Sequence, residues 1–251
     1  MKRHIPNALT LLNLFCGCIG VIYAVNSNFV TAAFFVFLGV FFDFFDGLLA
    51  RKLKVQSELG LQLDSLADLI TSGLVPGIVM YKLLELTLGE VTFDSSYGSW
   101  DTVISWNGLE YSLLPLLGLF ITLASAYRLA NFNIDTEQQT YFKGLPTPAN
   151  AVLILSLPLI MEFQNNDILN AIILNKWFLI AMTLLSCYLL NSGIKLFALK
   201  FKTFGFKENA TRYIFVLLCI VLLIVLQFAA IPLLTLLYII MSVLDNLTSK
   251  F

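Results

Sequence analysis

The chain has 251 residues, of which 59% are hydrophobic and only 12% are charged, and its mean hydropathy is +0.86. Soluble domains carry about 25% charged residues, so this composition excludes an ordinary soluble protein and indicates an integral membrane protein. The net charge of -1 excludes a general polyanion-binding surface, and nucleic acid is not expected as a partner.

Long apolar runs predict an all-α fold, a polytopic transmembrane helix bundle that forms a single domain over residues 1–251. A helix needs roughly 20 mostly apolar residues to cross a bilayer. The last two runs are joined by a tight turn and could form one broken hairpin, so six or seven spans are alternatives to eight. The eight runs cover residues 6–25, 29–50, 62–86, 111–131, 147–163, 177–197, 211–227 and 230–245.

Basic residues indicate the orientation of the bundle, because Lys and Arg accumulate on the cytoplasmic side of membrane proteins. With the N-terminus inside, 13 of the 15 basic residues fall in inner connections, and only Lys82 and Lys176 lie outside. The outer loop at roughly 87–110 is acidic. This distribution predicts an even number of spans with both termini in the cytoplasm.

Two pairs of aspartates flank the connection between the second and third runs. Asp43 and Asp46 are three residues apart, and Asp64 and Asp68 are four apart, so each pair lies on one face of a helix. Because consecutive spans are antiparallel, the four carboxylates can converge near the cytoplasmic membrane surface. Carboxylates packed together repel one another unless some are protonated or cations lie between them.

Three interpretations of these acids compete: solvated interfacial side chains, the ion path of a transporter, and a site for hard divalent cations. Acids within spans are rare and tend to be functional, which disfavours the first. Oxygen-only ligands suit Mg²⁺, Mn²⁺ or Ca²⁺ rather than zinc. The neighbours Gly47, Ala50, Arg51 and Gly60 offer bare backbone and a phosphate-binding guanidinium, although helix packing alone could explain the small residues.

The pattern Asp43-x2-Asp46-Gly47-x2-Ala50-Arg51-x8-Gly60-x3-Asp64-x3-Asp68 resembles the signature of the CDP-alcohol phosphatidyltransferase family at all eight fixed positions. The resemblance implies a six-helix core, here with two added spans, and a homodimer. It also implies a reaction in which an alcohol replaces CMP at the phosphorus that carries a lipid.

The resemblance further implies a role for each motif position. Two divalent cations, Mg²⁺ or Mn²⁺, would be bound by Asp43, Asp46, Asp64 and Asp68. Asp68 would also be the catalytic general base toward the acceptor alcohol. The cytidine diphosphate would contact Gly47, Ala50, Arg51, Gly60 and Asp64.

Three other segments, 1–20, 128–133 and 142–149, are similar to the phosphatidylserine synthase branch of this family. They imply CDP-diacylglycerol and L-serine as substrates. Arg128, Asn131 and Lys143 are therefore candidate acceptor-binding residues, although the usual pattern has a second arginine where Asn131 stands. The alternatives are snorkelling of Arg128 to the interface and a topological role for Lys143.

In the first run, Asn7, Thr10 and Asn13 share a helix face at three-residue steps. Asn7 and Thr10 are candidates for contact with the donor head group, and interhelical hydrogen bonding is the alternative.

The sequence therefore favours phosphatidyl transfer from CDP-diacylglycerol to serine. Within the family, the alternatives are phosphatidylglycerophosphate synthesis or another CDP-alcohol phosphotransfer. From another class, the alternative is a divalent-cation or proton-coupled transporter, which would place its ion site near the bilayer midplane. The expected location is the cytoplasmic (inner) membrane of a prokaryote, with the active site at the cytoplasmic face.

Overall fold

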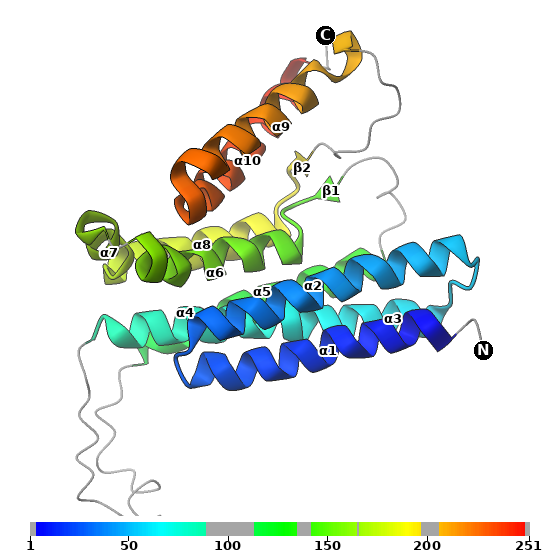
Figure 1. Cartoon of the computed structure of the whole chain (residues 1–251), viewed down its shortest axis with the longest axis horizontal. Helices are drawn as coiled ribbons and strands as arrows, with labels where there is room; N and C mark the ends of the chain where they lie inside the picture. Colours follow the sequence, from blue (N-terminus) through cyan, green and yellow to red (C-terminus); the bar gives the residue numbers. More distant parts are fainter. Residues whose placement is uncertain (1–3, 89–112, 135–141, 165, 197–205, 249–251) are drawn as a thin grey trace, which may run out of the picture.

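The computed structural model describes residues 4–88, 113–134, 142–164, 166–196 and 206–248, and this part of the chain is almost entirely helical (Figure 1). The helical fold class is confirmed. The helices are α1 (His4–Val25), α2 (Phe29–Lys52), α3 (Glu58–Asp68), α4 (Val75–Leu86), α5 (Phe120–Ile134), α6 (Thr147–Gln164), α7 (Asp167–Ile173), α8 (Lys176–Asn191), α9 (Phe206–Leu226) and α10 (Ala230–Thr248). Shorter elements are the π-helix η1 (Leu69–Leu74), the 3-10 helices η4 (Leu114–Leu119) and η5 (Gln227–Ala229), and the strands β1 (Phe142–Lys143) and β2 (Lys195–Leu196).

Side-chain caps fix where the helices that carry the aspartates begin. The Asn28 side chain accepts a hydrogen bond from the Thr31 backbone N–H at the start of α2. The Ser57 hydroxyl accepts from the Gly60 N–H at 3.1 Å, so α3 begins at Glu58 rather than at residue 62 as predicted. A cap of this kind satisfies a backbone donor that the helix itself leaves unpaired.

The third span contains a change of helical pitch directly after Asp68. Helices α3 and α4 are joined by the π-helix η1, and together they form a continuous stretch, Glu58–Leu86, that is long enough to cross a membrane. Within η1, the Thr71 hydroxyl donates to the Asn13 carbonyl at 3.1 Å. π-Helical turns are rare in proteins, and those that occur often lie at functional sites.

Helix α6 lies at the centre of the bundle. Most of its side chains from Thr147 to Ile160 are buried, and they share one hydrophobic core with α4 and with parts of α1, α2 and α8. Pro158 lies inside α6, which a membrane helix tolerates because neighbouring groups satisfy the freed backbone. In Figure 1, α6 and α8 lie between the layer that contains α1 to α3 and the pair α9–α10.

Five helical stretches among the described residues are long and apolar enough to cross a membrane, or six if the bent pair α7–α8 is one span. This supports an integral membrane protein, but it does not confirm eight spans. Helix α6 is not among the five. Its polar residues Asn150, Glu162 and Gln164 lower its hydropathy. Because most of its surface is buried against protein, it does not need the fully apolar surface of a helix that faces lipid.

The last two predicted runs form the hairpin α9–α10. By length and composition they make one stretch, Phe215–Leu244, but the chain reverses at Gln227, where φ is 49°. The Phe215 and Tyr238 rings lie 5.6 Å apart across the hairpin. The Gln164 amide donates to the Leu226 carbonyl at 2.6 Å and ties the turn to the end of α6.

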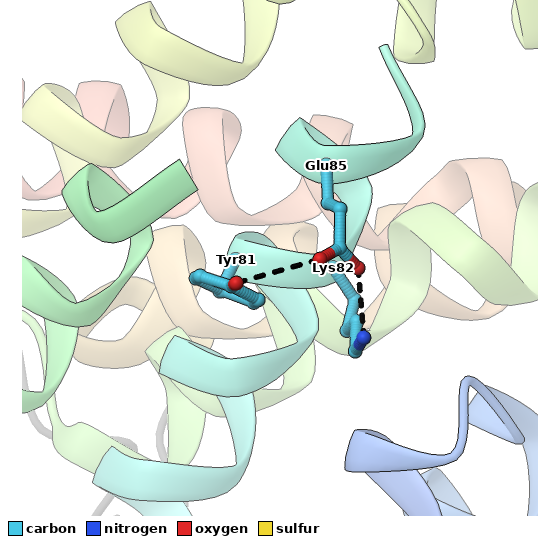
Figure 2. Close-up of polar contacts among 3 residues, drawn as sticks. All are labelled: Tyr81, Lys82 and Glu85. Atoms are coloured by element: carbon cyan, nitrogen blue, oxygen red, sulfur yellow. Dashed lines mark hydrogen bonds and ion pairs between the residues drawn. The ribbon is translucent and has the colours of Figure 1, made fainter. Parts of the chain in front are cut away.

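The start of α1, the α2–α3 connection and both strands lie toward the same end of the bundle in Figure 1. The acidic loop predicted at 87–110, with Glu90, Asp94, Asp101 and Glu110, lies outside the described residues from 89 onward. Lys82, predicted on the outer side, forms an ion pair with Glu85 at 2.7 Å, and Tyr81 donates to the same carboxylate (Figure 2). The cytoplasmic placement of both termini stays a prediction.

The sixth predicted run, 177–197, is wrong at its C-terminal end. Helix α8 ends at Asn191, and Lys195–Leu196 instead pairs antiparallel with Phe142–Lys143. Between β1 and α6, the Gly144 N–H donates to the Ile194 carbonyl at 2.9 Å, and the Leu145 N–H donates to the Leu189 carbonyl at 2.8 Å. Helix α8 therefore ends at Asn191, because the residues that follow it pair with the segment before α6 instead of continuing the helix.

Gly144→Ala should destabilise the protein, whereas Gly193→Ala should not. Gly144 has φ of +71°, and a Cβ there would lie 2.7 Å from the Leu190 carbonyl oxygen, while a Cβ at Gly193 would meet nothing within 4 Å. We expect Gly144→Ala to lower the free energy of unfolding by about 1–3 kcal/mol. Thermal unfolding of both variants in detergent tests this, and equal stability of the two would contradict it.

Candidate active site

Three of the four predicted metal ligands come together at one end of the bundle. The carboxylates of Asp43 and Asp46 on α2 and of Asp64 on α3 can each offer an oxygen within 4.8 Å of the others. Asp46 is only 5% exposed, and its Oδ2 accepts a hydrogen bond from the Thr10 hydroxyl at 2.6 Å. Helix α1 therefore fixes one carboxylate of the group.

Asp68 lies outside this group of three, one turn further along α3 than Asp64. It is buried, and its Oδ1 accepts a hydrogen bond from the Asn13 side-chain amide at 3.2 Å. Its carboxylate lies within the electrostatic range of Asp43, Asp46 and Asp64 and also of Arg128, the one basic residue of α5. Asp68 is therefore near both the acidic group and Arg128.

A cavity of about 890 Å³ opens beside the acidic group. It is large enough for a nucleotide, since ligand sites typically measure about 300–1,000 Å³. Its wall includes every residue that the sequence analysis assigned to the cytidine diphosphate or the donor head group: Asn7, Thr10, Gly47, Ala50, Arg51, Gly60 and Asp64. The structure thus brings these residues together, and their individual roles stay predictions.

The two glycines of the motif have different surroundings. A Cβ at Gly47 would meet only the Arg51 guanidinium, at 3.8 Å, so helix packing does not explain this glycine. A Cβ at Gly60 would lie 3.3 Å from the Ser57 hydroxyl and 3.4 Å from the Asn7 amide oxygen, so close packing against α1 contributes there. The Arg51 Nε donates to the Gly47 carbonyl at 2.9 Å, which holds the exposed guanidinium at the cavity wall.

A second, smaller cavity of about 350 Å³ collects the three predicted acceptor residues, Arg128, Asn131 and Lys143. Arg128 is buried rather than snorkelling, and its Nη2 donates to the Gly144 carbonyl at 3.3 Å. Its Nε has no hydrogen-bond partner among the described residues. A buried guanidinium with spare donors suits a carboxylate or phosphate ligand.

The sequence analysis did not assign two residues that the structure places at the site, Asn13 and Phe132, nor Lys195, which lies beside the smaller cavity. Asn13 contacts Asp68, and its position on the same face as Asn7 and Thr10 could have identified it. Lys195 lies directly opposite Lys143 in the strand pair, which no sequence pattern indicates. Phe132 contributes to the walls of both cavities.

The acidic group fits a hard divalent cation. Its donors are carboxylate oxygens alone, with no His or Cys in the group, and such a set suits Mg²⁺ or Mn²⁺ rather than zinc. Three carboxylates this close together repel one another unless some are protonated or a cation lies between them. The structure therefore supports an aspartate cluster that could hold a metal.

These features define a helical membrane protein with an acidic, nucleotide-sized cavity and an adjoining basic cavity at one end of its bundle. A family model for CDP-alcohol phosphatidyltransferases matches residues 3–245. The chain belongs to this family, which is a family of phosphotransferase enzymes.

The chain matches several proteins of known name, and the match covers a different share of each one's length. The chain is 32% identical to the CDP-diacylglycerol–serine O-phosphatidyltransferase of Bacillus subtilis over 68% of this chain and 81% of that protein. It is 31% identical to the enzyme of the same name from Helicobacter pylori, over 60% of this chain and 55% of that protein. An archaetidylserine synthase of Methanothermobacter thermautotrophicus is 29% identical over 61% of this chain and 56% of its own length. The match thus spans only about half of several relatives.

Thr10→Val should weaken metal binding without removing a ligand. The Thr10 hydroxyl orients Asp46, and losing the partner of a metal ligand typically lowers metal affinity roughly 10- to 100-fold. Thr10→Ser keeps the hydroxyl and should bind the metal like the parent protein. Mn²⁺ binding measured by electron paramagnetic resonance in detergent compares them, and unchanged affinity in Thr10→Val would show that the hydrogen bond does not orient a ligand.

Proposed function

We propose that the protein transfers the phosphatidyl group of CDP-diacylglycerol to the hydroxyl of L-serine and releases CMP. Two neighbouring cavities carry this proposal, because an acidic cavity of about 890 Å³ and a basic cavity of about 350 Å³ share the wall residue Phe132. A donor bound in the first and an acceptor bound in the second would lie side by side, as a transfer from one to the other requires. The names of the relatives support serine as the acceptor.

The four aspartates would hold two divalent cations, Mg²⁺ or Mn²⁺. When bound, such ions neutralise the diphosphate and stabilise the leaving CMP in an in-line displacement. The close grouping of Asp43, Asp46 and Asp64 supports their assignment as ligands. The assignment of Asp68 as a fourth ligand depends on the family resemblance alone.

The donor would lie in the larger cavity with its diphosphate against the wall formed by Gly47, Ala50 and Gly60. The absence of bulky side chains there lets phosphate oxygens approach the backbone. Arg51, held by its bond to the Gly47 carbonyl, would bind a phosphate oxygen with its remaining donors. Asn7 and Thr10 line the same cavity from α1 and would contact the head group.

Asp68 would take the proton of the serine hydroxyl as the hydroxyl oxygen bonds to phosphorus. A hydroxyl attacks poorly unless a base removes its proton during the reaction. The Asn13 amide binds Oδ1 of Asp68, which fixes the carboxylate and leaves Oδ2 for the proton. The proton transfer replaces a buried carboxylate by a neutral acid beside Arg128.

The smaller cavity would bind serine through its carboxylate. Arg128 offers a guanidinium with an unpaired Nε, and Asn131 and Lys143 lie in the same wall. The cavity volume of about 350 Å³ suits a small amino acid. Lys143 in the cavity wall and its strand neighbour Lys195 lie close to Arg128, and a group of basic residues there favours the second candidate, a phosphate-bearing acceptor such as glycerol 3-phosphate.

We also propose that the site opens toward the cytoplasm from the inner membrane of a prokaryote. The basic α2–α3 connection and the strands with Lys143 and Lys195 lie toward the same end as the site, which agrees with the positive-inside rule (Figure 1). The single domain over the whole chain and the homodimer implied by the family resemblance stay predictions that sizing in detergent can test.

The purified protein with Mg²⁺ or Mn²⁺ and CDP-diacylglycerol should release CMP when serine is added. Glycerol 3-phosphate should give little release, because the proposed acceptor site holds a carboxylate. Chromatographic separation of CMP and of the lipid product measures both. Release with glycerol 3-phosphate alone would replace serine by the second candidate. No release with any alcohol, together with metal uptake into vesicles, would indicate a transporter.

Asp68→Asn should lower turnover about 100- to 10,000-fold while CDP-diacylglycerol still binds, because the amide cannot accept the hydroxyl proton. Steady-state kinetics and binding of the donor, measured with the same preparation, separate the two effects. Asp167→Asn, an exposed change at the start of α7, is the matched control and should keep normal turnover. Full activity of Asp68→Asn would remove Asp68 from the role of base.

A further inference from the structure

The two cavities share one side chain. Phe132, near the C-terminal end of α5, contributes to the wall of the larger acidic cavity and to the wall of the smaller basic cavity. None of the other described residues lines both. Phe132 is 38% exposed, so a substantial part of its ring faces open space rather than protein.

The position of Phe132 is fixed by its neighbours on α5. Arg128 lies four residues earlier, so the two side chains occupy the same face of the helix. Asn133, the next residue, exchanges hydrogen bonds with the Ser65 hydroxyl on α3 at 3.0 and 3.2 Å. Ser65 directly follows Asp64, and this contact therefore holds the Phe132 backbone at a constant position relative to the acidic group.

A transferase with this arrangement must discriminate against water. Water carries the same hydroxyl nucleophile as an alcohol, is far more abundant, and is small enough to enter either cavity. If water attacks the lipid-bearing phosphorus, a P–O bond to water forms and the P–O bond to CMP breaks. The water proton passes to the base, and the products are phosphatidic acid and CMP.

We propose that Phe132 is a specificity-determining residue that separates the donor cavity from the acceptor cavity and shields the acceptor-facing side of the phosphorus, from which an in-line nucleophile must come, from water in the acceptor cavity. The inference rests on the proposed transfer reaction. An apolar ring suits this role because it offers no hydrogen bond to a water molecule that crosses between the cavities. A smaller side chain at this position would join the two spaces, and a polar one would offer a hydrogen bond to water between them.

The test is the partition of one substrate between two products. CDP-diacylglycerol labelled in its lipid is incubated with serine and metal, and phosphatidic acid and phosphatidylserine are separated and counted in the same reaction. Their ratio does not depend on how much of a preparation is folded. Phe132→Ala opens the wall, and Phe132→Gln keeps much of its size but makes it polar, while Phe132→Leu retains an apolar side chain.

We expect the ratio of phosphatidic acid to phosphatidylserine to rise about tenfold in Phe132→Ala and Phe132→Gln, and much less in Phe132→Leu. Tyr127→Ala removes another aromatic ring from α5 at an exposed position that lines neither cavity, and should leave the ratio unchanged. A parental ratio in both Phe132→Ala and Phe132→Gln would overturn the inference, even if total activity falls. If the parent protein transfers to no alcohol, the proposed function fails instead, and the two failures are therefore distinguishable.

Discussion

The fold must hold three carboxylates close together, with a fourth one helical turn away, at the edge of an apolar bundle, and this requirement explains much of the surrounding structure. Like charges repel more strongly as water is removed, so the aspartates need fixed partners and close helix contacts. Glycines permit those contacts: a Cβ at Gly39 would lie 2.7 Å from Thr71 and 2.8 Å from Asn13, and a Cβ at Gly17 would collide with the Thr71 hydroxyl. Helices α1, α2 and η1 can therefore approach closely enough for Thr10 and Asn13 to reach the two buried aspartates.

Much of the site was predictable from sequence because its geometry is local. Spacings of three and four residues placed each pair of aspartates on one helix face, and a short connection placed the two helices side by side. Gly47 and Arg51 lie within the same turns as Asp43 and Asp46, so they are close to these aspartates. Their assignment to the nucleotide came from the family resemblance, and the structure places all of the assigned residues in the wall of one cavity.

The rest of the site depends on contacts between distant segments, which periodicity does not encode. The strand pair brings residue 143 opposite residue 195, and the π-helix after Asp68 shifts the face that follows it. Neither the strand pair nor the π-helix can be recognised from the hydropathy of the sequence. The prediction of eight spans stays unconfirmed for a related reason: hydropathy alone does not separate a helix that faces lipid from α6, most of whose surface is buried in protein.

The departure at Asn131 has a structural counterpart. The usual family pattern has an arginine there, and in this chain the position carries an exposed amide at the wall of the smaller cavity. The β1–β2 pairing sets Lys195 opposite Lys143, which lines that cavity. The basic residues of the cavity wall therefore come from two segments, Arg128 on α5 and Lys143 on the strand pair, rather than from α5 alone. The contribution of the strands depends on the register of a pairing between distant segments, so the pattern of residues on α5 cannot reveal it.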